Sequence, residues 1–319
     1  MFVGIGMGVS AGGGGDDAGL SGADGLNFQR DRYRLNGVVY ASLMAVPGVT
    51  YSRTGAATAW RADGTLAEFA PNVPRITDKG VLIEGQRTNL LVWSQEMDRP
   101  SWAKSGAKIV ADAAIAPNNT LTADKLVEDN SGSLHQIFQA YAATTTSSPY
   151  SFTFFVKAAE RTKINFGANW VLSNVVIDLI TGAVSGPESS KVKTTARDNG
   201  WWEITYTGNA PDLETRTYVV RLIGPSGSSA YTGDGSSGVY LWGAQLELAA
   251  RASTPIITTG AAATVGADNL ALVLPAGVTS YSAEYGDNLT ATGPATPGPF
   301  DLATGRPWLD SVLRRIIFS

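Results

Sequence analysis

Short segments in which apolar and polar residues alternate recur between about residues 88 and 250 of this chain. In residues 151–157, Phe152, Phe154 and Val156 occupy every second position, which is the period of a β-strand rather than a helix. Glycine, asparagine, aspartate and serine separate these segments at short intervals, as in antiparallel sandwiches and not in alternating strand–helix units. The pattern predicts an all-β protein built around an antiparallel β-sandwich.

The same alternation assigns residues to faces. One face of each segment is large and apolar, and we expect these faces to form a single aromatic core. At about 1.5–3 kcal/mol for each buried large side chain, such a core can stabilise the domain without disulfides. The predicted core positions are Phe152, Phe154, Val156, Ile164, Phe166, Ala168, Trp170, Trp202, Ile204, Tyr206, Tyr218, Val220, Leu222, Tyr240, Trp242, Ala244, Leu246 and Leu248.

Composition excludes several classes of protein. The 319 residues include no cysteine and one histidine, which excludes disulfide scaffolds, thiolate nucleophiles and multi-histidine metal centres. The formal net charge of −4 provides no positive field for nucleic acid or an anionic membrane surface. No apolar run reaches the roughly 18–20 residues that span a bilayer. We therefore expect neither a nucleic-acid partner nor membrane insertion.

The first 26 residues contain ten glycines. Gly4-Ile5-Gly6-Met7-Gly8 is not followed by the Gly-Lys-Ser/Thr that a phosphate-binding loop requires. A segment this rich in glycine cannot bury enough of its own surface to become ordered alone. We expect residues 1–26 to be an N-terminal anchor arm that a neighbouring chain orders. The predicted anchor residues are Gly4, Gly6, Gly8, Gly12, Gly13, Gly14 and Gly15.

Residues 27–87 carry short apolar pieces around three turn signals, Asn36-Gly37, Asp63-Gly64 and Asp78-Lys79-Gly80. Asn-Gly and Asp-Gly between hydrophobic residues favour tight hairpins. Isolated hairpins of this size have no core of their own. We therefore expect 27–87 to be a docking segment that lies on a neighbour, followed by the sandwich at 88–250.

The remaining residues divide into a linker at 251–268 and a small C-terminal β module at 269–319. Residues 270–274 and 278–285 flank Pro275-Ala276-Gly277 and are expected to form a hairpin. The apolar tail 308–318 fits either a short helix or a last strand.

An ordered set of motifs in the central region resembles the jelly-roll domain of tailed-bacteriophage virion proteins, such as tail fibres, tail spikes and head spikes. The set comprises Asn89-Leu90-Leu91, Trp93-Ser94-Gln95, Trp102-Ala103-Lys104, Thr122-Ala123-Asp124-Lys125-Leu126, the stretch 150–158, Asn199-Gly200-Trp201-Trp202, Thr232-Gly233-Asp234-Gly235 and the stretch 239–247. The resemblance covers about 88–260 and extends weakly to 75–91. It implies a fold similar to carbohydrate-binding modules, a virion location, a homo-oligomer that is often a trimer, and glycan binding. It implies no catalytic residue.

Sugar binding requires aromatic rings beside hydrogen-bonding groups. The strand face opposite the predicted core offers Trp201 as the sharpest candidate, since Trp202 takes the core position. The other candidate glycan-binding residues on that face are Phe155, Asn165, Asp178, Glu203 and Arg221. A second interpretation stays open, in which the docking segment or another subunit covers this face.

Metal and catalytic sites are weaker predictions. Asp234 and Glu247 are candidate ligands for a structural Ca²⁺, because calcium binds clustered oxygens, although Asp-Gly is also an ordinary turn. His135 lies in an alternating segment without a Gly-x-Ser-x-Gly elbow, which favours a structural role. We expect no other cofactor and no enzyme, but a carboxylate pair for glycoside hydrolysis stays open.

The sequence thus predicts a structural protein of a tailed-phage virion, a fibre or spike component of the tail or baseplate that binds host surface polysaccharide. The N-terminal arm would contact other virion proteins. One alternative is a capsid decoration or head-fibre protein without a glycan role. Another is a secreted carbohydrate-active enzyme or its binding module.

Overall fold

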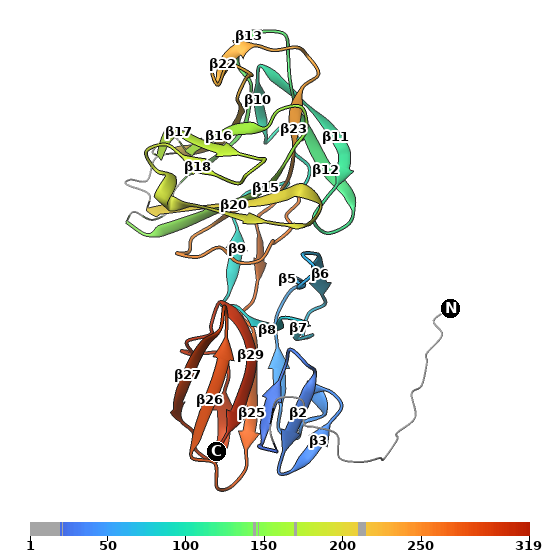
Figure 1. Cartoon of the computed structure of the whole chain (residues 1–319), viewed down its shortest axis with the longest axis vertical. Helices are drawn as coiled ribbons and strands as arrows, with labels where there is room; N and C mark the ends of the chain where they lie inside the picture. Colours follow the sequence, from blue (N-terminus) through green and yellow to red (C-terminus); the bar gives the residue numbers. More distant parts are fainter. Residues whose placement is uncertain (1–19, 21, 143–144, 146, 169–170, 210–214) are drawn as a thin grey trace, which may run out of the picture.

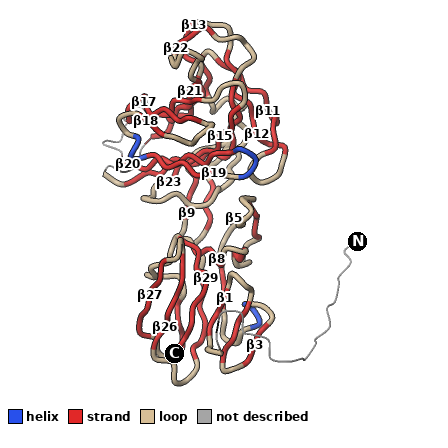
Figure 2. The backbone as a smooth tube through the Cα atoms, in the orientation of Figure 1, coloured by secondary structure: helices blue, strands red, loops and turns tan. Residues whose placement is uncertain are grey.

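The computed structural model describes residues 20, 22–142, 145, 147–168, 171–209 and 215–319. These residues form an upper and a lower lobe joined by a narrow neck (Figure 1). The described elements are 29 strands and three short 3-10 helices, and every strand pairing is antiparallel (Figure 2). The predicted all-β class is confirmed. The seven predicted anchor glycines and the predicted core residue Trp170 lie outside the described residues.

The upper lobe contains two six-stranded sheets, with the orders β11-β12-β23-β15-β20-β19 and β10-β14-β21-β16-β17-β18. A short ribbon of β13 and β22 lies at its far end (Figure 1). The strands are β10 (Ala103–Ser105), β11 (Ala107–Ile115), β12 (Leu121–Glu128), β13 (Gly132–Leu134), β14 (Gln136–Ala142), β15 (Pro149–Ala158), β16 (Lys163–Ala168), β17 (Val171–Asp178), β18 (Val184–Ser185), β19 (Val192–Ala196), β20 (Trp201–Asn209), β21 (Thr215–Leu222), β22 (Ala230–Thr232) and β23 (Gly238–Glu247). Two 3-10 helices, η2 (Ser189–Lys191) and η3 (Asp198–Gly200), flank β19.

Both six-stranded sheets contribute to one hydrophobic cluster, as the alternation predicted. Phe152 stacks on Phe166, with ring centroids 5.2 Å apart, and on Tyr218, at 4.8 Å. These rings belong to β15, β16 and β21, so they join the two sheets face to face. The cluster also holds Phe154, Val156, Ile164, Ile204, Tyr206, Val220, Leu222, Ala244 and Leu246.

A β-bulge reverses the prediction for part of β23. Thr153 lies opposite Gln245, but Phe155 lies opposite Trp242, so β23 has one extra residue there. Gly243 has φ +64 within the bulge, a conformation that glycine adopts without strain. The predicted core positions Tyr240 and Trp242 therefore turn to the outer face of the sheet. Leu248, also predicted to be core, is 47% exposed.

The lower lobe is built from both ends of the chain. Its larger sheet comprises β1 (Gly25–Asn27), β2 (Arg32–Leu35), β3 (Val38–Tyr40), β7 (Arg75–Thr77), β8 (Gly80–Ile83), β26 (Ser280–Tyr285), β27 (Leu289–Pro294) and β29 (Ser311–Phe318). A three-stranded sheet comprises β4 (Thr50–Ser52), β25 (Asn269–Leu274) and β28 (Gly298–Asp301), and the helix η1 (Leu43–Ala45) precedes β4.

The expected separation of 27–87 from 269–319 is therefore wrong. Strand β29 pairs with β1, β8 and β26, so the C-terminal strand lies between strands from both ends of the chain. One hydrophobic cluster includes Leu26, Val81 and Ile316. The sequence left a helix or a strand open for the tail 308–318, and it forms a strand. Alternation identifies a strand but does not indicate which distant strand will pair with it.

The hairpin expected around Pro275-Ala276-Gly277 is also absent. Strand β25 pairs with β4 and β28, whereas β26 pairs with β27 and β29. The turn thus connects two different sheets. In contrast, Asn36 and Gly37 both have positive φ, at 52° and 72°, and close the expected hairpin of β2 and β3.

The neck consists of a two-stranded ribbon, β9 (Arg87–Asn89) with β24 (Ala263–Val265). The hairpin of β5 (Ala57–Trp60) and β6 (Leu66–Phe69) extends from the lower lobe toward the upper one (Figure 1). Thr264 belongs to β24, so the expected 251–268 linker includes a paired strand. No helix in the described part of the chain is both long and apolar enough to cross a bilayer.

Candidate functional site

The outer face of β15 and β20, where we predicted a sugar site, is covered. Trp201 is 1% exposed and Phe155 is 0% exposed. They share a cluster with Trp60 and Leu66 of the β5–β6 hairpin and with Trp242. The Trp201 indole nitrogen donates to the Ile115 carbonyl oxygen at 3.1 Å. Neither ring can present its face to a sugar, and the second interpretation, a cover by the docking segment, holds for these two residues.

Glu203 lies at the edge of this covered face and contacts the β5–β6 hairpin through Arg197. One oxygen of its carboxylate accepts hydrogen bonds from two nitrogens of the Arg197 guanidinium. The Arg197 guanidinium lies over the Trp60 ring, 3.8 Å from its centroid, a favourable cation–π position. The Glu203 carboxylate is therefore engaged in holding the hairpin against the upper lobe.

The other three predicted sugar-binding residues lie on the opposite side of the lobe. Asn165, Asp178 and Arg221 belong to β16, β17 and β21 of the second sheet, with the core between them and Trp201. Arg221 bonds Gln136 at 2.5 Å and Asn165 at 3.4 Å. The six candidates thus do not form one surface. Alternation separates inward from outward residues but does not indicate which sheet a strand joins.

Asp178 forms hydrogen bonds within the turn that follows β17. Its carboxylate accepts hydrogen bonds from the backbone N–H groups of Ile180 and Thr181, at 2.9 and 3.1 Å. Burial lowers the pKa of the Arg221 guanidinium.

The two candidate calcium ligands lie at opposite ends of β23. Asp234 accepts from the backbone of Ser236 and Ser237 and from the Ser237 hydroxyl, so it is a turn residue. The hydrogen bonds from Ser237 hold the pKa of Asp234 far below its usual range. Glu247 bonds Ser253 and Gln245, and burial raises its pKa. A ten-residue strand is roughly 30 Å long, so these two carboxylates cannot bind one ion together.

Within the described residues, no group of three or more histidine or acidic side chains is placed to hold a metal ion. His135 is fully buried, and its ring nitrogens lie 2.5 Å from the Gly106 carbonyl oxygen and 3.0 Å from that of Tyr231. These contacts fit the structural role predicted for His135.

Comparisons with known proteins give no family: no family model matches the chain, and no curated protein matches it. The candidate site therefore rests on geometry alone.

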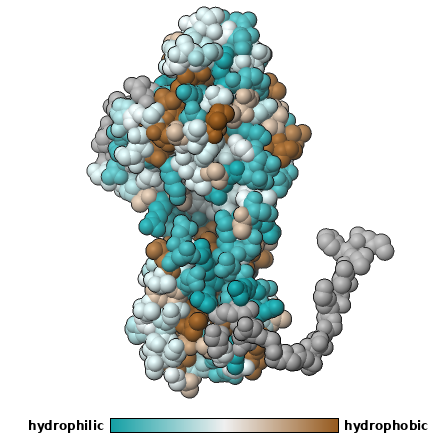
Figure 3. All heavy atoms as spheres, in the orientation of Figure 1, coloured by the Kyte–Doolittle hydropathy of each residue, from teal (hydrophilic) through white to brown (hydrophobic). Residues whose placement is uncertain are grey.

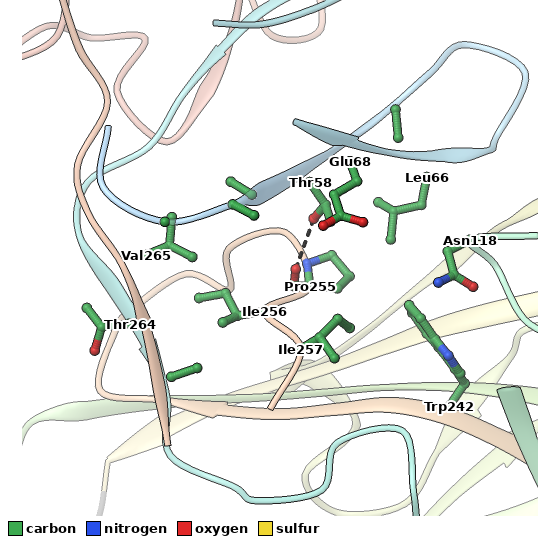
Figure 4. A pocket seen from close by; sticks show the side chains of 15 residues that line it. Thr58, Leu66, Glu68, Asn118, Trp242, Pro255, Ile256, Ile257, Thr264 and Val265 are labelled. Carbon is green, nitrogen blue, oxygen red and sulfur yellow. Dashed lines mark hydrogen bonds between the residues drawn. The ribbon is translucent and has the colours of Figure 1, made fainter. Parts of the chain in front are cut away.

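A cleft of about 320 Å³ lies where the neck, the hairpin and the upper lobe meet. In Figure 4 the β5–β6 hairpin lies above it, residues 255–257 below, β24 at one side, and Trp242 with Asn118 at the other. Hydrophilic side chains gather over the narrow region between the lobes in Figure 3. No local sequence pattern indicates this site, because its walls come from five separate segments: the hairpin, Asn118, Trp242, residues 255–257 and β24.

The cleft has an apolar interior and a polar rim. Ala57, Leu66, Pro255 and Ile256 are buried along its walls, whereas Ile257 is 40% exposed. The remaining rim groups include the exposed Glu68, the half-buried Asn118 and the exposed Thr264. Glu68 is the one carboxylate among the described residues that line the cleft.

A buried charged network lies next to the cleft. Asp268 accepts hydrogen bonds from Arg53 at 3.2 Å, from Arg75, and from the backbone N–H of Glu84 at 2.8 Å. Glu84 in turn pairs with Arg75 at 2.5 Å and accepts from the Thr254 backbone at 3.0 Å. Buried ion pairs with several hydrogen bonds are stiff and directional. The network therefore links the lower lobe to the segment that enters the cleft.

Proposed function

We propose that this chain is a structural protein of a tailed-bacteriophage virion, a fibre or spike component of the tail or baseplate, and that its upper lobe is a jelly roll. Its eight principal strands are β12, β14, β15, β16, β17, β20, β21 and β23. Numbered one to eight, they follow the orders 1-8-3-6 and 2-7-4-5 in the two sheets. This double Greek-key order is that of jelly rolls in viral capsid and lectin domains, and it supports the proposal.

The observation that carries the proposal is the role of the family-like motif at Asn89. The Asn89 side chain is fully buried. It donates to the carbonyl oxygens of Ala244 and Ile256 and accepts from the N–H groups of Leu91 and Leu246. It therefore joins the neck to β23, another segment of the motif set. Such a joint explains why these two distant motifs would occur together.

A second motif residue acts similarly. The Trp102 indole nitrogen donates to the Trp93 carbonyl oxygen at 2.9 Å, and Trp102 packs in the upper core. The motif set thus builds the fold of the lobe, which supports a shared architecture rather than a shared catalytic centre.

The partners in this proposal are other virion proteins, contacted through the N-terminal arm, two further copies of this chain in a homotrimer, and a host surface polysaccharide. The chain would reside in the virion. The lower lobe, in which β1 pairs with β29, would be the part closest to the particle.

The test is antibody labelling of purified phage particles from a host that encodes the chain, with mass spectrometry of the same particles. We expect the protein in the particles and label on the tail or baseplate. Label over the head would favour the decoration or head-fibre alternative. A chain absent from particles that releases reducing sugars from host polysaccharide would contradict the proposal and favour the enzyme.

A further inference from the structure

We propose that the cleft between the lobes binds one uncharged or amino-bearing sugar unit of a polysaccharide. The proposal rests on the function above, since it gives an attachment protein its ligand site. It moves that site away from the aromatic face predicted from sequence. The exposed large hydrophobic residues of the described chain include no aromatic ring.

The size of the cleft fits a small ligand. Its volume of about 320 Å³ lies at the lower end of the roughly 300–1,000 Å³ range of small-molecule sites. Such a space accepts one or two sugar rings. One sugar unit of a polymer can occupy the cleft while the remaining units stay outside.

Two polar groups on different segments face this space without partners in the described structure. Glu68 is exposed on β6, and its carboxylate makes no hydrogen bond or ion pair among the described residues. The Asn118 side-chain oxygen accepts from the Thr120 N–H and hydroxyl, at 3.3 and 2.6 Å. This contact leaves the Asn118 amide nitrogen as a free donor. One acceptor and one donor match the two functions of a sugar hydroxyl.

The apolar part of the cleft matches the other side of a pyranose ring. Ile257 is 40% exposed at the rim, and Leu66 and Pro255 continue the surface inward. Sugar rings carry C–H groups that pack on apolar side chains. Aliphatic walls that carry two polar groups favour a hydroxylated ring over a fully apolar ligand.

Charge narrows the ligand class. Glu68 is the one carboxylate among the described residues that line the cleft, and no basic side chain lines it there. A carboxylate that lines the cleft repels an anionic sugar and attracts an amine. Neutral sugars and amino sugars are therefore accepted, and uronic or sialic acids are rejected.

The walls are held before a ligand arrives. The Thr58 hydroxyl donates to the Pro255 carbonyl oxygen at 2.9 Å (Figure 4). The Thr254 hydroxyl donates to the Thr58 carbonyl oxygen at 2.9 Å. These bonds tie the hairpin to the segment below the cleft. A preformed site loses less freedom when it binds.

The experiment measures binding of the purified full chain to an array of neutral, amino and uronic oligosaccharides, followed by calorimetry with each positive probe. We expect binding of a neutral or amino probe and none of the uronic probes. Because a hydrogen bond to a charged group is a strong contact, Glu68→Gln should weaken binding about tenfold or more. Ile257→Ala should weaken it several-fold.

Two variants serve as matched controls. Leu289 is an exposed aliphatic residue of β27, and Glu96 is an exposed carboxylate paired with Arg99. Leu289→Ala and Glu96→Gln should leave affinity within about twofold of the wild type. All four substitutions are at exposed side chains, so each variant should fold.

Failure of the inference and failure of the proposed function give different results. If particles contain the chain but no probe binds, or if the Glu68 and Ile257 variants bind normally, the cleft is not a sugar site although the virion function stands. If Glu68→Gln prevents incorporation into particles and no probe binds the wild type, the cleft serves a protein partner and our inference is wrong. Absence of the chain from particles rejects the virion function regardless of binding.

Discussion

Both lobes consist of antiparallel sheets, but their strands come from differently arranged parts of the sequence. The upper lobe comes from one continuous stretch, from β10 to β23, and its core residues follow local alternation. The lower lobe joins strands from the first 83 residues to strands after residue 268. Alternation predicts the core of a lobe when its strands are close in sequence. It does not predict a core that combines strands before residue 84 with strands after residue 268.

The same contrast applies to the binding surfaces. The sugar site predicted from the sequence lies on the face of β15 and β20 in the upper lobe. The β5–β6 hairpin, which extends from the lower lobe, covers that face. The cleft exists only because both lobes and the hairpin are in place. The dependence of one lobe on the other can therefore be measured by substitutions in each.

The largest effect is expected from deleting residues 311–319, which contain β29. This strand buries Leu313, Ile316 and Phe318 in the lower core. Losing three large buried side chains removes roughly 5–9 kcal/mol, comparable with the whole stability of a domain. Hydrogen exchange should show loss of protection throughout the lower lobe, while residues 103–247 keep theirs. Loss of protection in both lobes would mean that the upper lobe does not fold independently.

The second effect concerns the buried charges in the neck. Asp268→Asn removes the charge that faces Arg53 and Arg75, both 1% exposed. We expect a loss of about 3–5 kcal/mol in the free energy of unfolding, because buried positive charge is left uncompensated. The control, Glu96→Gln in an exposed pair, should cost less than about 1 kcal/mol. Denaturant titration measures both, and equal losses would contradict a role for the neck in stability.

The third effect tests the bulge in β23. An alanine Cβ at Gly243 would lie 2.9 Å from the Phe155 ring, and the residue has φ +64. Gly277 has φ +92 with nothing within 4 Å of an added Cβ. Gly243→Ala should cost about 1–3 kcal/mol and Gly277→Ala less, as measured by thermal unfolding. Equal costs would show that backbone strain alone decides, without the contact to Phe155.

The smallest effect is a pH dependence of the upper lobe. Burial raises the pKa of Asp124 to about 6, although its carboxylate accepts hydrogen bonds from the backbone of Met97 and Asp112. Because the folded pKa exceeds the unfolded value near 4, the protonated form stabilises the fold. This contribution is complete below pH 4 and is lost as the pH rises to about 6.

We expect a gain of about 1 kcal/mol in the upper lobe between pH 7 and pH 4 from this group, reduced by solvent screening from the full shift. Asp124→Asn should remove that part of the pH dependence in denaturant titrations. An unchanged pH profile in the variant would assign the dependence to other groups.

The local features of this protein follow from its residue pattern alone. Period-two alternation placed Phe152, Phe154 and Phe166 in the core, because side chains of a strand point to opposite faces wherever the strand lies. Turn chemistry placed the Asn36-Gly37 hairpin, because these residues adopt positive φ at low cost.

The choice of strand partners, in contrast, depends on the folded chain as a whole. The tertiary structure placed Asn165 and Trp201 on opposite sheets, turned Trp242 outward through a bulge, covered Trp201 with the hairpin, and joined β1 to β29. These features depend on contacts between residues far apart in the chain. Local patterns do not encode partner choice, because any strand with the right apolar face can satisfy the same alternation.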